Sequence, residues 1–195
     1  MTTIKNKLVK TISYASLVLL LGIVSCTSSG EKTTKITENI STVETPKMDI
    51  QAAVLSNNLE VVKQHIKAGT DINKKDAMSG STPLITAVSF GKKEIAKALI
   101  DAKANLNLKN NDGSTALHSA AFFCRTELVQ ILIDAGADQA AKNNFGATPK
   151  ESVMGPFEAI KPIYKMLQQQ LAPMGLEIDL DHIEKTRPTI ASMLK

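Results

Sequence analysis

Between residues 83 and 135 the apolar positions fall into pairs of short segments with helical spacing. A first segment over residues 83–90 is matched by one over 116–123, and a second segment begins near Lys93 in one copy and near Thr126 in the next. In these second segments the apolar residues are Ile95, Ala98, Leu99 and Ala102, matched by Leu128, Ile131, Leu132 and Ala135. Since residues three and four apart share one face of a helix, the pattern predicts paired short helices that each bury one face.

The same pattern repeats with a fixed period. Glycines recur at one constant spacing, at Gly80, Gly113 and Gly146, and threonines recur at the same spacing, at Thr82, Thr115 and Thr148. An upstream copy over residues 49–73 aligns with a slightly longer offset, because the connection 76–80 holds one extra residue. A period in this range is typical of a stacked solenoid, in which each unit buries its apolar face against its neighbours. We therefore expect one continuous core in which Leu99 and Leu132 occupy equivalent buried positions.

Each unit carries its own turn and helix-start signals. The glycines occupy turns that need a positive φ, and the threonine two residues later can cap a helix through its hydroxyl. Pro83 and Pro149 follow at the first helical position, where the missing N–H costs nothing. The first copy departs from the pattern at Gln64 and His65, in columns that are apolar in the later copies. Because a terminal unit needs a polar outer face, Gln64 marks the beginning of the stack. His65 is interpreted as an end-cap polar residue, with a functional histidine as the alternative.

These segments resemble ankyrin repeats through Thr82-Pro83-Leu84, Thr115-Ala116-Leu117-His118, Glu60-Val61-Val62-Lys63, Ala68-Gly69 and Ala135-Gly136-Ala137-Asp138. The resemblance covers about residues 48–153. It implies an all-α fold, an ankyrin-repeat solenoid of helix-turn-helix units with short hairpin loops. The units of the domain 48–154 would span residues 48–75, 76–109, 110–142 and, in part, 143–154. His118 falls at the histidine of the family's pattern, so the resemblance implies that it hydrogen-bonds neighbouring backbone.

After Val153 the repeat pattern ends, and residues 155–195 form an extension with a different pattern. Apolar residues of the segment 155–175 lie on one helical stripe, which we expect to kink or restart at Pro162: Phe157, Ile160, Ile163, Tyr164, Leu167 and Leu171. Residues 176–180 alternate between apolar and polar side chains, which suits an extended segment. Two short helical turns should follow, the second beginning at Pro188. Because the open end of a repeat stack must be covered, we expect a helical C-terminal cap.

The segment 1–26 has the layout of an export signal, with a basic start, an apolar middle and the small residue Ser25 before Cys26. Polar residues on both sides leave the apolar centre too short to cross a bilayer stably. The tetrad Ile23-Val24-Ser25-Cys26 resembles the lipobox of bacterial lipoprotein precursors. This resemblance implies that a signal peptide over residues 1–25 is removed and that Cys26 is acylated. An ordinary signal with a chance cysteine, or an uncleaved anchor, is the alternative.

The same resemblance sets the expected location. More than one acyl chain at Cys26 would attach the protein lastingly to a lipid bilayer. Thr27, in place of an acidic residue, resembles lipoproteins sent on to the outer membrane. We therefore expect a lipid-anchored protein of the bacterial cell envelope, on the outer membrane or facing the periplasm. Residues 26–47 comprise the lipidated cysteine and a polar tether rich in Ser, Thr, Glu and Lys, which shows no apolar period. Cys124 would then have no disulfide partner.

The charge distribution argues against a nucleic-acid partner. The chain carries a net charge of +4, but three of its lysines lie in the segment 1–26, which contains no acidic residue. The remainder carries 20 basic and 19 acidic groups. Nucleic-acid binding depends on a concentrated basic surface that displaces counterions from phosphates, and the sequence holds no run or helical stripe of Lys and Arg.

No constellation of residues points to catalysis, to a metal or to a cofactor. The histidines His65, His118 and His182 are spread over different elements without metal-ligand spacing. Cys124 lies six residues beyond His118, about 9 Å along a helix, which is too far for a nucleophile and its base. We therefore expect no enzyme activity. One charged cluster in the extension keeps a small-molecule or enzymatic role open as an alternative to a solvated helix face: Asp181, His182, Glu184 and Arg187.

A surface that binds another protein is the expected functional site. Stacks of the family usually bind proteins through their hairpin tips and short helices, which form a concave face. Carried over position by position, this surface contains Lys75, Met78, Ser89, Lys109, Asn111, Asp112, Phe122, Lys142, Asn144 and Phe145. Because aromatic residues are favoured at interface centres, we expect a groove anchored by Phe122 and Phe145 and rimmed by the three lysines. The hypothesis is a monomeric, membrane-tethered adaptor or scaffold with an unknown protein partner. A self-associating structural protein of the envelope is the alternative.

Overall fold

The computed structural model describes residues 44–195, and these residues form one compact unit. The predicted signal peptide, the predicted lipidation site at Cys26 and most of the predicted tether lie outside the described residues. Residues 44–195 contain α-helices and no β-strand, as the sequence predicts. None of these helices is long and apolar enough to cross a membrane.

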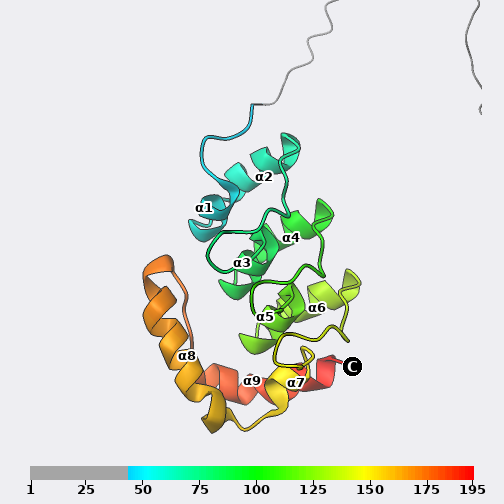
Figure 1. Cartoon of the computed structure of the whole chain (residues 1–195), viewed down its shortest axis with the longest axis vertical. Coiled ribbons are helices and arrows are strands. Elements are labelled where there is room, and N and C mark those ends of the chain that lie inside the picture. Colours follow the sequence, from blue (N-terminus) through cyan, green and yellow to red (C-terminus); the bar gives the residue numbers. More distant parts are fainter. Residues whose placement is uncertain (1–43) are drawn as a thin grey trace, which may run out of the picture. The chain divides into compact units, whose positions relative to one another are not determined.

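The helices come in pairs over most of the described chain (Figure 1). The pairs are α1 (Ile50–Leu55) with α2 (Leu59–Lys67), α3 (Pro83–Ser89) with α4 (Lys93–Asp101), and α5 (Ala116–Phe122) with α6 (Thr126–Asp134). They are followed by α7 (Glu151–Met154), α8 (Phe157–Leu171), the short 3₁₀ helix η1 (Ala172–Met174) and α9 (Leu180–Met193). The predicted starts of α4 and α6 are confirmed, and α3 and α5 end one residue earlier than predicted.

The three pairs stack so that equivalent helices lie on one another. The first helices form the column α1, α3, α5 and the second helices form the column α2, α4, α6. Leu99 and Leu132 are both fully buried, which confirms the predicted register of the second helices. Leu84 and Leu117 are buried in the same way in the first helices. Since burial of one such side chain contributes about 1.5–3 kcal/mol, this shared seam is the main source of stability.

Local sequence decides where the first helices of the pairs begin. The Oγ1 of Thr82 accepts a hydrogen bond from the N–H of Ile85 at 3.3 Å, and Thr115 caps α5 in the same way through the N–H of His118 at 3.4 Å. Both threonines have extended backbone angles, and Pro83 follows at the first position of α3. The caps predicted for α3 and α5 are therefore confirmed, whereas α7 begins at Glu151, so Pro149 is not at its first helical position.

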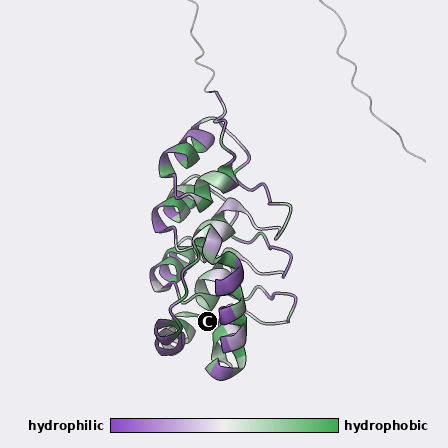
Figure 2. Cartoon of the chain, turned by 90° about the vertical axis from the view of Figure 1, so that its left-hand side faces the viewer, coloured by the Kyte–Doolittle hydropathy of each residue, from purple (hydrophilic) through white to green (hydrophobic). Residues whose placement is uncertain are grey.

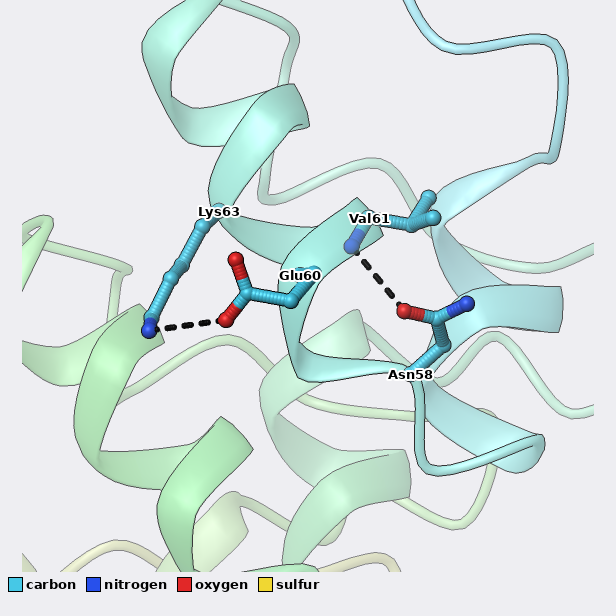
Figure 3. Close-up of polar contacts among 4 residues, drawn as sticks. All are labelled: Asn58, Glu60, Val61 and Lys63. Carbon is cyan, nitrogen blue, oxygen red and sulfur yellow. Dashed lines mark hydrogen bonds and ion pairs between the residues drawn. The ribbon is translucent and has the colours of Figure 1, made fainter.

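Helix α2 begins at a different kind of cap, which Figure 3 shows. The Oδ1 of Asn58 accepts from the N–H of Val61 at 3.1 Å. One turn later, Lys63 and Glu60 form an exposed ion pair at 3.1 Å. Gln64 is exposed on the same helix, as expected of a polar outer face at the beginning of the stack.

His65 is buried and fully engaged. Its Nε2 donates to the carbonyl oxygen of Met48 at 2.7 Å, because a carbonyl can only accept, and its Nδ1 lies 3.2 Å from the hydroxyl of Thr70. The histidine thus joins the chain before α1 to the loop after α2, which supports the end-cap interpretation.

The C-terminal extension differs from the sequence prediction at both prolines. Pro162 lies inside α8, and the two short turns predicted around Pro188 are one continuous helix, α9. Each proline removes the N–H that would bond the carbonyl four residues earlier, at Glu158 and at Glu184. Both prolines and both glutamates are exposed, so water can satisfy these carbonyls and the helices continue.

Helix α9 covers the end of the stack, which is the expected cap. It packs against α5, α6 and α7, and in Figure 1 it continues the stack beyond the third pair. Ile183 and Ile190 are buried in this contact, and the opposite face of α9 is polar and exposed. In the segment before α9, buried Leu176 and Ile178 alternate with exposed residues, as predicted for an extended stretch.

Candidate interaction surface

The candidate surface is a row of three hairpin loops along one edge of the stack. We call residues 75–81, 109–114 and 142–147 the hairpin row; its loops project to the right in Figure 2. One backbone hydrogen bond closes each loop at the same position: Asp76 N–H to Ser81 O at 2.9 Å, Asn110 N–H to Ser114 O at 2.9 Å, and Asn143 N–H to Ala147 O at 3.0 Å. The second and third loops therefore repeat one geometry, and the first closes in the same way with one extra residue.

A side-chain oxygen at one position organises each loop from within. Asn110 Oδ1 accepts from the backbone N–H of Asp112 and of Ser114, and Asn143 Oδ1 accepts from the two equivalent residues of its loop. Asp76 does the same in the first loop, where it accepts from the N–H groups of Met78, Ser79 and Ser81. Burial works to raise the pKa of Asp76, but these hydrogen bonds together lower it. Sequence reasoning missed these three residues, although they recur with the period of the repeat.

Asn111 and Asn144 join each loop to the preceding one. The N–H of Asn111 donates to Ser79 O at 2.9 Å, and its Nδ2 donates to Met78 O at 3.0 Å. Asn144 makes the same two bonds one repeat further on, to Asp112 O at 2.9 Å and to Asn111 O at 2.8 Å. The sequence predicted these asparagines as partner contacts; in the structure their side-chain amides hold neighbouring loops together and so make the row rigid.

Met78 and Phe145 point away from the protein. Their relative exposures are 89% and 80%, the highest of the exposed large apolar side chains in residues 44–195. Met78 stands in the column of Asn111 and Asn144, but the first loop has no preceding loop to bond. Its side chain therefore makes no contact of this kind and extends into solvent. The sequence prediction that Met78 and Phe145 lie on the surface of the row is consistent with this placement.

One lysine per loop stands in a common column, at Lys75, Lys109 and Lys142, and all three side chains are exposed. The ammonium group of Lys109 donates to the backbone carbonyl of Lys142 at 2.8 Å, so it lies along the row and bridges two loops. Asp112 is an exposed acidic residue of the second loop. The three lysines predicted to rim the binding surface thus follow one another along the hairpin row, one on each loop.

Phe122 is not free, contrary to the expectation that it anchors an open groove. Its ring lies 4.5 Å from the ring of Tyr164 on α8 and meets Phe123 edge-on at 5.1 Å. The Tyr164 hydroxyl donates to the carbonyl oxygen of Phe122 at 2.6 Å. Helix α8 stands beside α5 in Figure 1, so the chain covers its own concave face at this repeat.

Ser89, predicted as a contact residue, lies one repeat earlier in the same column as Phe122. Its hydroxyl donates to Ile85 O at 2.9 Å.

Arg187 holds α8 and α9 together from inside. Only 5% of this residue is exposed; its Nη2 donates to Gly155 O at 2.8 Å and its Nη1 lies 3.4 Å from the Tyr164 hydroxyl. Burial raises the pKa of Tyr164 to about 12, so its hydroxyl keeps the proton that it donates to Phe122. The charged cluster considered from the sequence is thus divided: Arg187 points inward, whereas Asp181, His182 and Glu184 are exposed.

The remaining reactive groups have structural contacts. The Nδ1 of His118 accepts from Thr115 N–H at 3.2 Å, its Nε2 donates to Ala147 O at 3.0 Å, and burial lowers its pKa. Cys124 is buried, its thiol lies 3.7 Å from Ile183 O, and burial raises its pKa to about 11. Such a thiol stays protonated near neutral pH and is a poor nucleophile. In residues 44–195 no group of three or more His, Cys, Asp or Glu side chains could hold a metal ion.

Two shallow, open hollows lie outside the hairpin row. One, of about 290 Å³, is lined by residues including Gly91, Cys124, Arg125 and His182. The Nε of Arg125 is buried there without a hydrogen-bond partner, but its Nη2 donates to Glu177 O at 3.3 Å. The other, of about 460 Å³, lies beside residues 137–140 and Lys195. The first hollow is also lined by Lys93 and Glu127, but these two side chains pair with each other at 2.9 Å.

Comparison with known proteins agrees with this geometry. Residues 50–143 match the family model described as ankyrin repeats, in three copies. The protein phosphatase 1 regulatory subunits 27 of Homo sapiens and Mus musculus are each 45% identical to the chain over 63 residues, which is 32% of this chain and 40% of the relative. The match thus spans less than half the length of these curated relatives.

Among solved structures, the ankyrin repeat domain of Bcl-3, described as a unique member of the IkappaB protein family, is similar to this chain. The TM-score is 0.52 at 35% sequence identity, over 53% of this chain and 45% of that one. The predicted fold class is therefore confirmed: the chain carries an ankyrin-repeat domain. Ankyrin repeats are protein-interaction modules, which agrees with the predicted kind of partner.

Proposed function

We propose that this ankyrin-repeat domain is the binding part of a membrane-tethered adaptor or scaffold of the bacterial cell envelope. The hairpin row binds a protein partner, and acylated Cys26 attaches the chain to the bilayer. The protein carries out no chemical step of its own. One observation carries the proposal: a rigid, hydrogen-bonded row of loops presents Met78 and Phe145 to solvent, at 89% and 80% exposure.

The energetics favour a protein partner on this row. Burial of a Met or Phe side chain is worth about 1.5–3 kcal/mol relative to leaving it exposed. The loops are already ordered by their internal hydrogen bonds and by Asn111 and Asn144, so little conformational entropy is lost on binding. The curated relatives are regulatory subunits of a phosphatase by name, which also supports a binding role over a catalytic one.

The sequence around Cys26 supports the membrane attachment. The tether joins the domain just before α1, where the His65 ring binds the carbonyl of Met48 at 2.7 Å. The attachment point is thus at the beginning of the stack, and two of the three loops of the hairpin row follow α4 and α6 further along it. A domain tethered in this way can present its row to a partner near the membrane.

A Cys26→Ser variant tests the attachment. Because the thiol is the acylation site, we expect this variant to accumulate as an unprocessed precursor without attached lipid. The mass of the chain and its fractionation between membrane and soluble extracts measure both properties. Maturation and fractionation like those of the parent would contradict the lipoprotein assignment.

Self-association is the alternative that the sequence leaves open, and the ends of the stack weigh against it. Exposed polar residues cover the outer side of α2 at the beginning of the stack: Glu60, Lys63, Gln64 and Lys67. At the other end, the outward face of α9 is also polar and exposed. End-to-end stacking of two copies would desolvate these groups without pairing them, so a foreign partner is favoured.

Affinity capture from native envelopes tests the proposed function. The full-length chain should retain a foreign protein that Phe145→Ala loses. Met166→Ala serves as the matched control, because Met166 is also exposed but lies on α8, away from the hairpin row. Capture of only the chain itself, or equal capture by both variants, would contradict the proposal.

A further inference from the structure

We infer that the partner contributes an extended, acidic segment with an apolar side chain at each end, which lies along the hairpin row. This inference rests on the proposed function and adds the chemistry of the partner. Three features of the described residues carry it: the closure of the concave face at the third repeat, the spacing of the two exposed anchors, and the column of lysines.

The chain closes its own concave face where Phe122 lies. Displacement of α8 would expose Tyr164, which is fully buried, and would uncover Leu176, whose N–H donates to Leu171 O at 3.1 Å. It would also remove the hydroxyl that faces the buried guanidinium of Arg187. Loss of these buried apolar and polar contacts is unfavourable, so α8 is a fixed wall. A partner therefore finds its exposed apolar anchors on the hairpin row, at Met78 and Phe145.

The distance between the anchors sets the length of the segment. Met78 lies on the first loop and Phe145 on the third, so two repeats separate them. Packed helices lie about 8–10 Å apart, which places the anchors roughly 16–20 Å apart along the stack. An extended chain in the polyproline II conformation advances about 3.1 Å per residue with three residues per turn, so the two apolar side chains of the partner should be about six residues apart, on one face.

The lysine column sets the charge of the segment. Lys75, Lys109 and Lys142 recur once per repeat, and none of them takes part in the ion pairs of residues 44–195, which involve Lys63, Lys93, Lys97 and Lys161. The lysines follow one another at the repeat spacing of about 8–10 Å, close to three residues, or one turn, of an extended chain in the polyproline II conformation. Acidic residues at about every third position share one face of such a chain and would meet the lysines in register.

Asp112 favours a peptide over an anionic membrane surface as the occupant. It is exposed on the middle loop, in the same column as Phe145 and between the two anchors. An anionic bilayer that buried Met78 and Phe145 would also bring the Asp112 carboxylate against its negatively charged headgroups. The repulsion between these like charges opposes membrane binding. A peptide avoids the conflict, because it can place a neutral residue opposite Asp112 and its acidic residues opposite the lysines.

Fluorescence anisotropy with three synthetic peptides tests the inference on the full-length chain in a mild detergent. The first peptide carries two Leu about six residues apart and Glu at every third position, with Ser elsewhere. The second has Lys in place of Glu, and the third has Ser in place of Leu. We expect binding of the first peptide alone, and we expect it to weaken as salt rises from about 50 to about 300 mM.

Variants locate the site. Lys75→Gln combined with Lys142→Gln should weaken binding about fivefold, and Phe145→Ser about tenfold. Lys109 is kept, because its ammonium group holds the third loop. The matched controls are Lys67→Gln combined with Lys97→Gln on the second helices of two repeats, and Met166→Ser on α8; both should bind like the parent. The melting temperature of each variant confirms that it is folded.

Each outcome decides the question. Equal binding of the Lys peptide, or parent-like binding by the double lysine variant, would overturn the inference. The inference would also be overturned if the chain bound phosphatidylglycerol vesicles more tightly than the acidic peptide and Phe145→Ser lost this vesicle binding. If no peptide binds but envelope capture still yields a protein that Phe145→Ala loses, the inference fails and the proposed function stands. If capture also yields nothing, both fail.

Discussion

Removal of one hydroxyl, in Tyr164→Phe, probes the contact that closes the concave face. This hydroxyl donates to Phe122 O at 2.6 Å and faces Arg187 Nη1 at 3.4 Å. The ring of the variant can still pack on Phe122, so the change removes polar contacts and leaves the apolar ones. Arg187 keeps its bond to Gly155 O at 2.8 Å. The main loss is therefore the partner of the Phe122 carbonyl.

The expected cost follows from that loss. A buried acceptor left without its donor costs about 1–3 kcal/mol. For a domain of this size, 1 kcal/mol corresponds to a shift of about 2–4 °C in melting temperature. A cost of about 2 kcal/mol thus predicts that Tyr164→Phe melts about 4–8 °C below the parent at pH 7.

The pH dependence separates this account from a purely steric one. The pKa of Tyr164 is raised from 10.0 to about 12 by burial, so below pH 10 the tyrosine is protonated in both the folded and the unfolded chain. Between pH 10 and 12 the unfolded chain loses its proton first, and the stability of the parent falls by up to about 2.7 kcal/mol. The phenylalanine variant lacks this group. Cys124 titrates in both proteins, so its contribution cancels when their free energies of unfolding are compared. The difference in free energy of unfolding between parent and variant should therefore shrink from pH 10 to 12.

Urea unfolding, followed by circular dichroism at pH 7 and at several values between 10 and 12, measures the effect. Ile163→Val is the control, because Ile163 lies beside Tyr164 on α8 but is 42% exposed. We expect it to unfold like the parent. Equal stability of parent and Tyr164→Phe at pH 7, or a difference that stays constant up to pH 12, would refute the proposed role of the hydroxyl.

Three further outcomes test the stack. Leu132→Ala should cost about 2–5 kcal/mol in urea unfolding, because Leu132 is fully buried, and unchanged stability would contradict the shared core. Gly113→Ala should destabilise more than Gly146→Ala. Both glycines have positive φ, at 73° and 77°, but only at Gly113 would the added Cβ meet another residue, Asn144; equal melting temperatures would contradict this packing. Cys124 should resist iodoacetamide at pH 8 until urea unfolds the chain, because burial raises its pKa to about 11; rapid labelling of the folded chain, measured by mass spectrometry of the Cys124 peptide, would contradict its burial.

The repeat part of the fold was predictable because its determinants are local and recur. Thr82 and Thr115 cap helices within three residues of themselves, and the apolar residues of α4 and α6 share one face at helical spacing. The constant period of the repeat then places equivalent positions on one another, so Leu99 and Leu132 could be assigned to the core from the sequence. The exposure of Phe145 and the lysine column follow from the same period.

The candidate site was only partly predictable, because some of its contacts join residues far apart in the sequence. Nothing near Phe122 indicates that Tyr164, 42 residues later, covers it. Arg187 belongs to a charged cluster in the sequence, yet it turns inward to Gly155, 32 residues earlier. Pro188 suggests a helix start, but α9 continues through it because the carbonyl that it leaves unpaired lies on the solvent side.

The sequence by itself determined the helix pairs, their register and the repeated loop that carries one lysine per unit. Short-range caps, turns and apolar spacing act within one repeat, and the next repeat copies them. Only the tertiary structure decided which of the predicted apolar contact residues stay open. The C-terminal extension has no repeat to copy, so its place on α5 depends on burial of Tyr164 and Arg187 against distant residues. That packing covers Phe122 and leaves Met78 and Phe145 to solvent.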